Sequence, residues 1–187
     1  GDFIGPNGGT VEYYTTTADV VVPTSSTGTG LALNRYYNLV LNASPGRTIT
    51  LPDTDVEVLN NLTINGSNIV QTRNAGTGRS YQVNKNLNIE SGTLQYRNGV
   101  AANISVLGNL EISSGANFNV LNGGTVVANT LEIYGNLINN GTFNMVGGTR
   151  NTATYFKGKQ NASIEGSGAT SNFHSLFVDK GSDATPV

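Results

Sequence analysis

Residues 86–99 read NLNIESGTLQYRNG, two short stretches of alternating apolar and polar residues on either side of a Ser-Gly pair. Leu87 and Ile89 come before the pair, and Leu94 and Tyr96 come after it. Alternation with a period of two is typical of a strand with one buried face, and Gly next to Ser is typical of a turn. The segment therefore predicts two consecutive strands joined by a tight corner.

Looser copies of this segment occur elsewhere in the chain. They read NLTINGSNIVQTR at 61–73, NLEISSGANFNVLNG at 109–123 and NLINNGTFNMVGG at 136–148. The most regular feature is an Asn-Leu pair, and its leucines recur at spacings of 23, 25 and 23 residues, at Leu39, Leu62, Leu87 and Leu110. A constant period of this length indicates a solenoid, in which each repeat packs against the next one.

A second regularity predicts a third strand in each repeat. An apolar residue lies four positions before three of these leucines, as Val58 before Leu62, Val83 before Leu87 and Val106 before Leu110. The same offset joins Ile133 to Leu137, which favours Leu137 over Leu131 as the next leucine of the series and gives a repeat of 27 residues there. Each repeat then holds strand C before the Asn-Leu pair, strand A at the leucine and strand B after the corner.

The ends of the chain are assigned by comparison with these copies. Val11 in GGTVEYY is assigned to an early B strand, and Leu176 in FHSLFVDKG to the last A strand. Residues 147–187 also retrace residues 8–51, because each begins with GGT and continues to an aromatic pair. Neither end offers the polar cap that a solenoid needs. We therefore expect one β-helix segment, 1–187, excised from a longer repetitive protein.

These units predict an all-β fold, a right-handed parallel β-helix with three short strands in each coil of about 23–27 residues. A single coil cannot bury its own apolar face, but coils stacked at about 4.8 Å turn equivalent positions into continuous ladders. A leucine-rich repeat would need a helix or its own Leu-Asn signature, and a β-sandwich would not require a period. The expected core residues are Leu39, Leu62, Leu87, Ile89, Leu94, Tyr96, Leu110, Phe118, Leu137 and Phe143.

The composition restricts the possible functions. The chain has 26 Asn, 24 Gly and 22 Thr, only 12% charged residues, and a net charge of −2 without any basic stripe. Nucleic acid is therefore not expected as a partner, and no apolar run approaches the roughly 20 residues of a membrane span. Cysteine is absent, which excludes disulfides and thiolate metal sites. Asn, Thr and Gly in such excess suggest an extracellular protein at a bacterial cell surface.

Few residues suggest chemistry. Asp53 and Asp55 in LPDTDVEVL form the densest acidic cluster and are the only candidates for binding a hard cation such as Ca²⁺. A solvated strand entry is the favoured interpretation of both, and no cofactor is expected. Glycoside hydrolysis would require a matched pair of carboxyl groups. The single histidine, His174, is accompanied by no nucleophile motif.

The combination GGTVEYY, YYNLVLN, NNLTINGS and GTLQYRNG resembles the repetitive β-helical regions of large Bacteroidetes cell-surface proteins. That resemblance covers essentially the whole chain. It implies export by the type IX secretion pathway and a role like that of gliding-motility adhesins.

Two functions follow from the sequence. The first is a non-catalytic structural or adhesive module, a rod-like stalk or presenting surface. Its partners would be neighbouring repeats of the same protein, with end-to-end self-association as a consequence of unpaired edges. The alternative is a polysaccharide-binding or polysaccharide-cleaving β-helix, whose partner would be a surface polysaccharide. A flat Asn/Thr/Ser surface would favour the first function, and a concave groove with acidic and aromatic residues the second.

Overall fold

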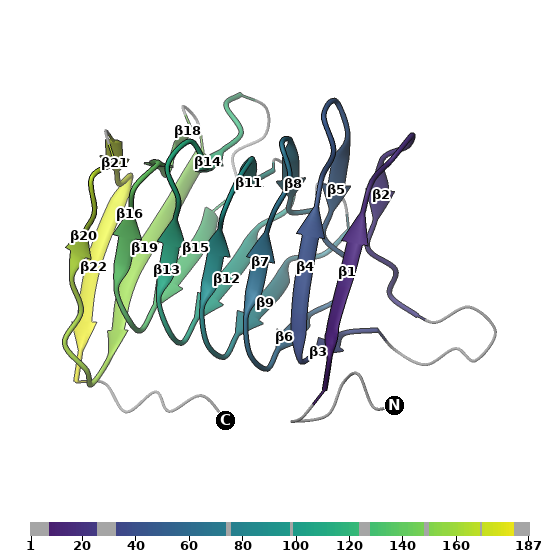
Figure 1. Cartoon of the computed structure of the whole chain (residues 1–187). Coiled ribbons are helices and arrows are strands. Elements are labelled where there is room, and N and C mark those ends of the chain that lie inside the picture. Colours follow the sequence, from purple (N-terminus) through teal and green to yellow (C-terminus); the bar gives the residue numbers. More distant parts are fainter. Residues whose placement is uncertain are drawn as a thin grey trace.

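A computed structural model of the chain describes residues 8–25, 33–73, 76–97, 99–123, 128–147, 150–168 and 170–181, with only the backbone described for Arg150 and Asn151. All regular elements in these ranges are strands. Figure 1 shows them wound around one axis as a β-solenoid of about six turns. The all-β class and the solenoid architecture are therefore confirmed.

The strands form three parallel sheets that share the axis of the solenoid. Sheet A contains β1 (Thr10–Tyr14), β4 (Asn38–Asn42), β7 (Leu62–Ile64), β10 (Leu87–Ile89), β13 (Leu110–Ile112), β16 (Leu137–Asn139) and β20 (Ile164–Glu165). Sheet B contains β2 (Val20–Val21), β5 (Thr48–Thr50), β8 (Ile69–Gln71), β11 (Thr93–Tyr96), β14 (Asn117–Val120), β17 (Thr142–Asn144) and β21 (Thr170–Asn172). Sheet C contains β3 (Arg35–Tyr36), β6 (Val56–Val58), β9 (Arg79–Val83), β12 (Ala102–Val106), β15 (Ala128–Ile133), β19 (Arg150–Gly158) and β22 (Ser175–Lys180). The short strand β18 (Val146–Gly147) pairs antiparallel with the start of β19.

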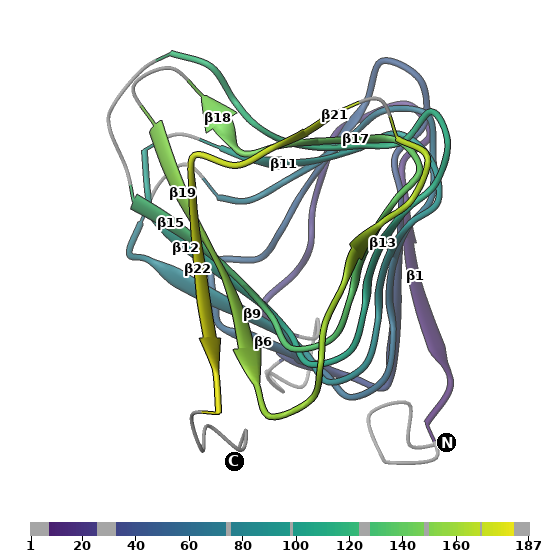
Figure 2. The ribbon, with the colours of Figure 1, turned by 90° about the vertical axis from the view of Figure 1, so that its left-hand side faces the viewer.

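Figure 2 shows the molecule from its C-terminal end. The chain rises through sheet A, crosses through sheet B at the top and descends through sheet C, so it runs anticlockwise while successive coils approach the viewer. That sense of winding is right-handed, as the sequence predicts.

The core is a set of ladders inside the three sheets. The leucines of the Asn-Leu pairs are in register from coil to coil, and the pairing of Leu110 with Leu137 confirms the 27-residue repeat. Each of the ten residues expected in the core is at most 4% exposed. Tyr96, Phe118, Phe143 and Phe173 form an aromatic series along the axis, with ring centroids 5.4, 6.0 and 5.1 Å apart.

The corner between sheets C and A explains the offset of four residues. In four successive coils it contains three residues, at 59–61, 84–86, 107–109 and 134–136. A corner of fixed length holds the last apolar residue of strand C four positions before the leucine of strand A. The corner between sheets B and C is less regular, with five residues after β5 and β11 but seven after β8 and β14.

Two assignments near the ends were wrong. Val11 lies in sheet A, where it pairs with Leu39, and not in sheet B. Leu176 lies in β22 of sheet C, where it pairs with Thr154. Alternation shows which side chains face inward, but it is the same in all three sheets. The sheet of a strand is identified only by the number of residues that separate it from the strands before and after it in the chain. The segments 8–51 and 147–187 therefore do not occupy equivalent positions in the solenoid. The first leads into β1 of sheet A, and the second leads into β19 of sheet C.

Candidate functional site

The asparagines of the Asn-Leu pairs form a ladder along the corner between sheets C and A. Each side-chain oxygen accepts a hydrogen bond from the backbone N–H of the equivalent residue one coil later. The donors are the N–H groups of Asn61 (3.3 Å), Asn86 (3.2 Å), Asn109 (2.9 Å), Asn136 (3.0 Å) and Ser163 (3.0 Å). Backbone polar groups without a partner are costly when water cannot reach them. The ladder therefore stabilises each corner and fixes the register between coils.

This ladder is not among the features expected from the sequence, because Asn is common in turns of every kind. The signal was nevertheless present, since an Asn precedes each leucine of strand A from Leu39 to Leu137. A residue that recurs at one position of every coil must stack on its own copies.

The structure places Asp53 and Asp55 against donors of the next coil. One oxygen of Asp53 is 3.0 Å from Nε of Arg79, and the other is 3.7 Å from the guanidinium of Arg73. Asp55 accepts a hydrogen bond from the backbone N–H of Ser80 at 2.8 Å. Across the described ranges, no group of three or more His, Asp or Glu side chains could hold a metal ion. Both carboxylates thus have protein partners.

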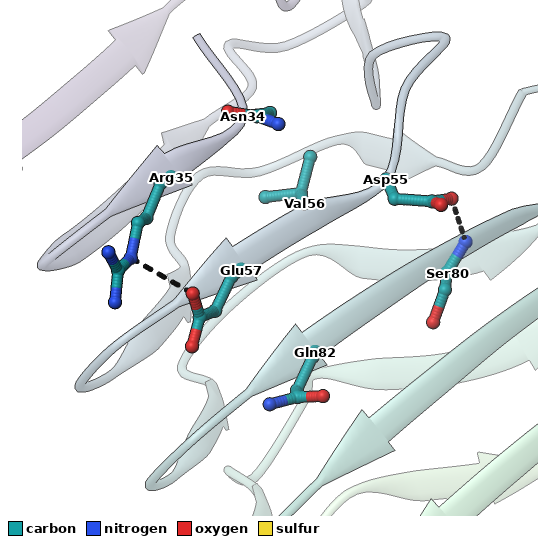
Figure 3. A pocket seen from close by; sticks show the side chains of 7 residues that line it. All are labelled: Asn34, Arg35, Asp55, Val56, Glu57, Ser80 and Gln82. Atoms are coloured by element: carbon teal, nitrogen blue, oxygen red, sulfur yellow. Dashed lines mark hydrogen bonds and ion pairs between the residues drawn. The ribbon is translucent and has the colours of Figure 1, made fainter. Parts of the chain in front are cut away.

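An open depression lies on the outer face of sheet C, and Asp55 is part of its lining. It has a volume of about 430 Å³, and its lining includes Arg35, Asp55, Glu57, Ser80 and Gln82 (Figure 3). Nε of Arg35 lies 2.9 Å from a carboxylate oxygen of Glu57, and both side chains are in contact with solvent. Figure 3 shows that the lining side chains come from three neighbouring strands.

A second depression, of about 320 Å³, continues the first one toward the C-terminal end. It shares Asp55 and Ser80 with the first depression and extends to Asn103 on β12 and Thr130 on β15. We call the two together the sheet-C groove. It crosses five consecutive strands of the sheet, from β3 to β15.

Beyond the groove, the outer face of sheet C carries charged and aromatic side chains. Glu132 accepts hydrogen bonds from Ser105 Oγ at 3.1 Å and from Nζ of Lys157 at 2.6 Å. The hydrogen bond to Glu132 raises the pKa of Lys157. The rings of Tyr155 and Phe177 stack with centroids 4.6 Å apart and planes inclined by 14°. Since this distance is close to the strand spacing, the two ring faces are directed along the axis and their edges point outward.

Three tyrosines are buried inside the solenoid, and burial raises the pKa of each. Their hydroxyl groups donate hydrogen bonds to backbone carbonyls, Tyr36 to Leu33 at 3.1 Å and Tyr81 to Pro52 at 3.1 Å. Tyr96 donates to the carbonyl of Thr130 at 2.8 Å. The protonated phenol is the form that fits these positions.

His174 is exposed in the connection between β21 and β22. None of the described segments is a helix that could cross a membrane. No protein-family model matches the chain, and comparisons with curated proteins and with solved structures give no match either.

Proposed function

We propose that this chain is a non-catalytic structural module, a segment of a rod that spaces or presents an adhesive surface outside a bacterial cell. The observation that carries this proposal is the uninterrupted register of the coils. Three parallel sheets, the inner apolar ladders and the asparagine ladder all repeat from coil to coil. Hydrogen bonds that run along the axis at every corner and strand give a structure that resists extension in that direction.

Composition and resemblance support the extracellular part of the proposal. The outer face of sheet B is rich in Asn and Thr, which stay hydrated without carrying net charge. The resemblance to repetitive Bacteroidetes surface proteins is the reason to propose export by type IX secretion and an adhesin-like role.

The last coil supports neighbouring repeats as partners. Ile164, Leu176 and Val178 lie at positions equivalent to buried core residues, yet they are 48%, 45% and 73% exposed. Among the described residues β20 and β22 each pair on one side only, and apolar side chains at such an edge are suited to packing against another coil.

The carboxylates near the sheet-C groove favour a structural role over a catalytic one. A glycosidase needs one carboxylic acid that gives its proton to the leaving group and a second carboxylate across the scissile bond. Here Glu57 is paired with Arg35, and Asp53 is paired with two arginines. These carboxylate oxygens are thus engaged by arginine side chains of the same protein rather than left as a matched pair across an open site.

Single-molecule pulling between the two ends tests the mechanical role. We expect the rod to resist force and then to release coils one at a time, each adding about 75–95 Å of chain for 23–27 residues. Leu87→Asp should lower the unfolding force, because it places a charge at a fully buried position. Asn88→Asp is the matched control, since Asn88 is the next residue of β10 and faces outward. A chain that extends without any force-resistant step would contradict the proposal.

A turnover assay tests the non-catalytic part. The protein is incubated with neutral and acidic polysaccharides, and new reducing ends and unsaturated products are measured. We expect neither. Turnover that is lost in Asp55→Asn or Glu57→Gln would overturn the proposal in favour of an enzyme.

A further inference from the structure

We propose that the sheet-C groove binds a neutral, linear polysaccharide whose chain lies along the solenoid axis. The inference does not depend on the rod-like role, because a rod with or without a ligand would have the same core. It rests on the shape of the groove, the chemistry of its lining and the balance of its charges.

The shape of the groove fits a long and narrow ligand. The two depressions adjoin at Asp55 and Ser80, and together they extend across five strands. Four strand spacings of about 4.8 Å give a length of about 19 Å. Small residues, among them Gly78, Ala101 and Ala102, line its second half and leave room above the sheet. One coil spacing is also close to the length of one sugar in an extended chain, so successive sugars would meet equivalent positions of successive coils.

The lining offers the donors and acceptors that hydroxyl groups need. The register of sheet C places Glu57 beside Gln82, and Ser80 beside Asn103. Gln82 uses its amide N–H in a hydrogen bond with Asn84 and keeps its oxygen as an acceptor. The side-chain oxygen of Asn103 is buried and has no hydrogen-bond partner, although the residue lines the groove.

Charge decides against an anionic ligand. The ionisable groups of the lining are two cations, Arg35 and Arg79, and two anions, Asp55 and Glu57. Arg35 already pairs with Glu57, and Arg79 already pairs with Asp53. No cation is left to attract a polyanion, so nucleic acid and acidic glycans lack the electrostatic term that would hold them.

Backbone pairing decides against an extended peptide. A peptide binds most readily by adding a strand to an open sheet edge, where backbone N–H and C=O groups are free. The strands β6, β9 and β12 under the groove are paired with neighbours on both sides. They present side chains rather than backbone groups, and hydroxyl groups of a sugar chain are the better match.

Isothermal titration of the full chain tests the proposal. The probes are neutral hexasaccharides of β-1,4-linked and β-1,3-linked glucose, and of mannose, xylose and galactose. An acidic hexasaccharide of galacturonate and an extended hexapeptide of Ser and Asn serve as the competing ligands. We expect saturable binding of at least one neutral hexasaccharide and none of the galacturonate or the peptide.

Variants locate the site. Gln82→Ala and Asn103→Ala should each weaken binding by about three- to tenfold, the effect of losing one hydrogen bond. Gln95→Ala is the matched control. Like Gln82, Gln95 is an outward-facing glutamine. It donates a hydrogen bond to Asn119 at 2.9 Å, as Gln82 does to Asn84 at 2.7 Å. It lies on sheet B, outside the groove, so its loss should leave the affinity unchanged.

Three results would overturn the inference. They are the absence of binding by every neutral hexasaccharide, binding of galacturonate or peptide alone, and equal weakening by Gln82→Ala and Gln95→Ala. Melting curves of the three variants show whether each of them is folded at the assay temperature. A groove variant that is unfolded at that temperature is replaced by Gln82→Glu. That change keeps the size of the side chain and adds an acceptor charge, and it should alter the preference among neutral hexasaccharides if the groove is the site.

Discussion

Asn86 shows how a single side chain can hold two coils together. Its backbone N–H donates to the side chain of Asn61, and its own side-chain oxygen accepts from the N–H of Asn109 at 2.9 Å. The residue therefore connects the coil before it with the coil after it. Asn61, Asn109 and Asn136 make the same pair of contacts in their own coils.

Replacement of Asn86 tests the asparagine ladder. Asn86→Ala leaves the N–H of Asn109 without its acceptor and should lower the free energy of unfolding by about 1–3 kcal/mol. Asn86→Asp keeps an acceptor oxygen and should lose less. Chemical denaturation followed by circular dichroism measures both values. An alanine variant as stable as the unmodified chain would show that water replaces the ladder at no cost.

The buried tyrosines predict how stability depends on pH. The folded-state pKa of Tyr36, Tyr81 and Tyr96 is raised above the ordinary value of about 10. The folded state then binds protons more tightly than the unfolded state, so the stability is fully present below pH 10 and is lost as the pH rises above it. We expect a cooperative alkaline transition in which unfolding and the ultraviolet absorbance of tyrosinate change together.

A pair of variants provides the control for this transition. Tyr96→Phe removes one buried phenol and should make the alkaline loss of stability less steep. Tyr14→Phe removes a phenol that is 63% exposed and should leave it unchanged. Ionisation of all tyrosines near pH 10 in a protein that remains folded would contradict the expectation.

Among the elements, the corner between sheets A and B depends on glycine for two separate reasons. Gly92 and Gly115 occupy it in successive coils, with φ values of +69° and +80°. An added Cβ at Gly92 would lie 2.5 Å from the carbonyl oxygen of Asn68, whereas at Gly115 it would meet nothing within 4 Å. The two glycines share the backbone conformation but differ in the space around them.

Alanine at each position separates these two effects. Gly115→Ala should cost only about 1 kcal/mol, the price of a left-handed conformation for a residue with a side chain. Gly92→Ala should cost clearly more, because the carbonyl of the preceding coil must also move. The measurement is the difference between the two midpoints of thermal unfolding. Equal midpoints would mean that the coils separate locally without penalty.

The strands could be predicted from the sequence, because the period of two and the constant offset of four are local properties. The core ladder from Leu39 to Leu137 follows from them directly. The sheet of a terminal strand could not be predicted, because Val11 and Leu176 lack the flanking offsets that identify the sheet. The groove could not be predicted either, since its lining from Arg35 to Thr130 is assembled only through the stacking of five coils.

At the scale of the whole molecule, the last coil has an apolar edge. Val178 is 73% exposed although its partner in the preceding coil, Phe156, is 4% exposed. We expect association of the protein through this edge at high concentration. An edge strand with exposed apolar side chains can pair with a strand of another molecule and bury those side chains.

Sedimentation velocity over a range of concentrations measures this association. Val178→Lys should shift the protein toward the monomer, because a charged side chain protects a strand edge. Thr63→Lys adds the same charge to the outer face of sheet A in the middle of the rod and should have no effect. A protein that stays monomeric at every concentration would exclude end-to-end contact.

The unequal corners have a consequence for how such a protein can change over generations. The three-residue corner fixes the offset between the strands of sheets C and A, whereas the corner after sheet B already accommodates five or seven residues. Insertions and deletions at that second corner would alter the surface beside the groove while every coil keeps its place in the stack. A lineage built on this design can therefore vary its outer surface without having to evolve its framework again.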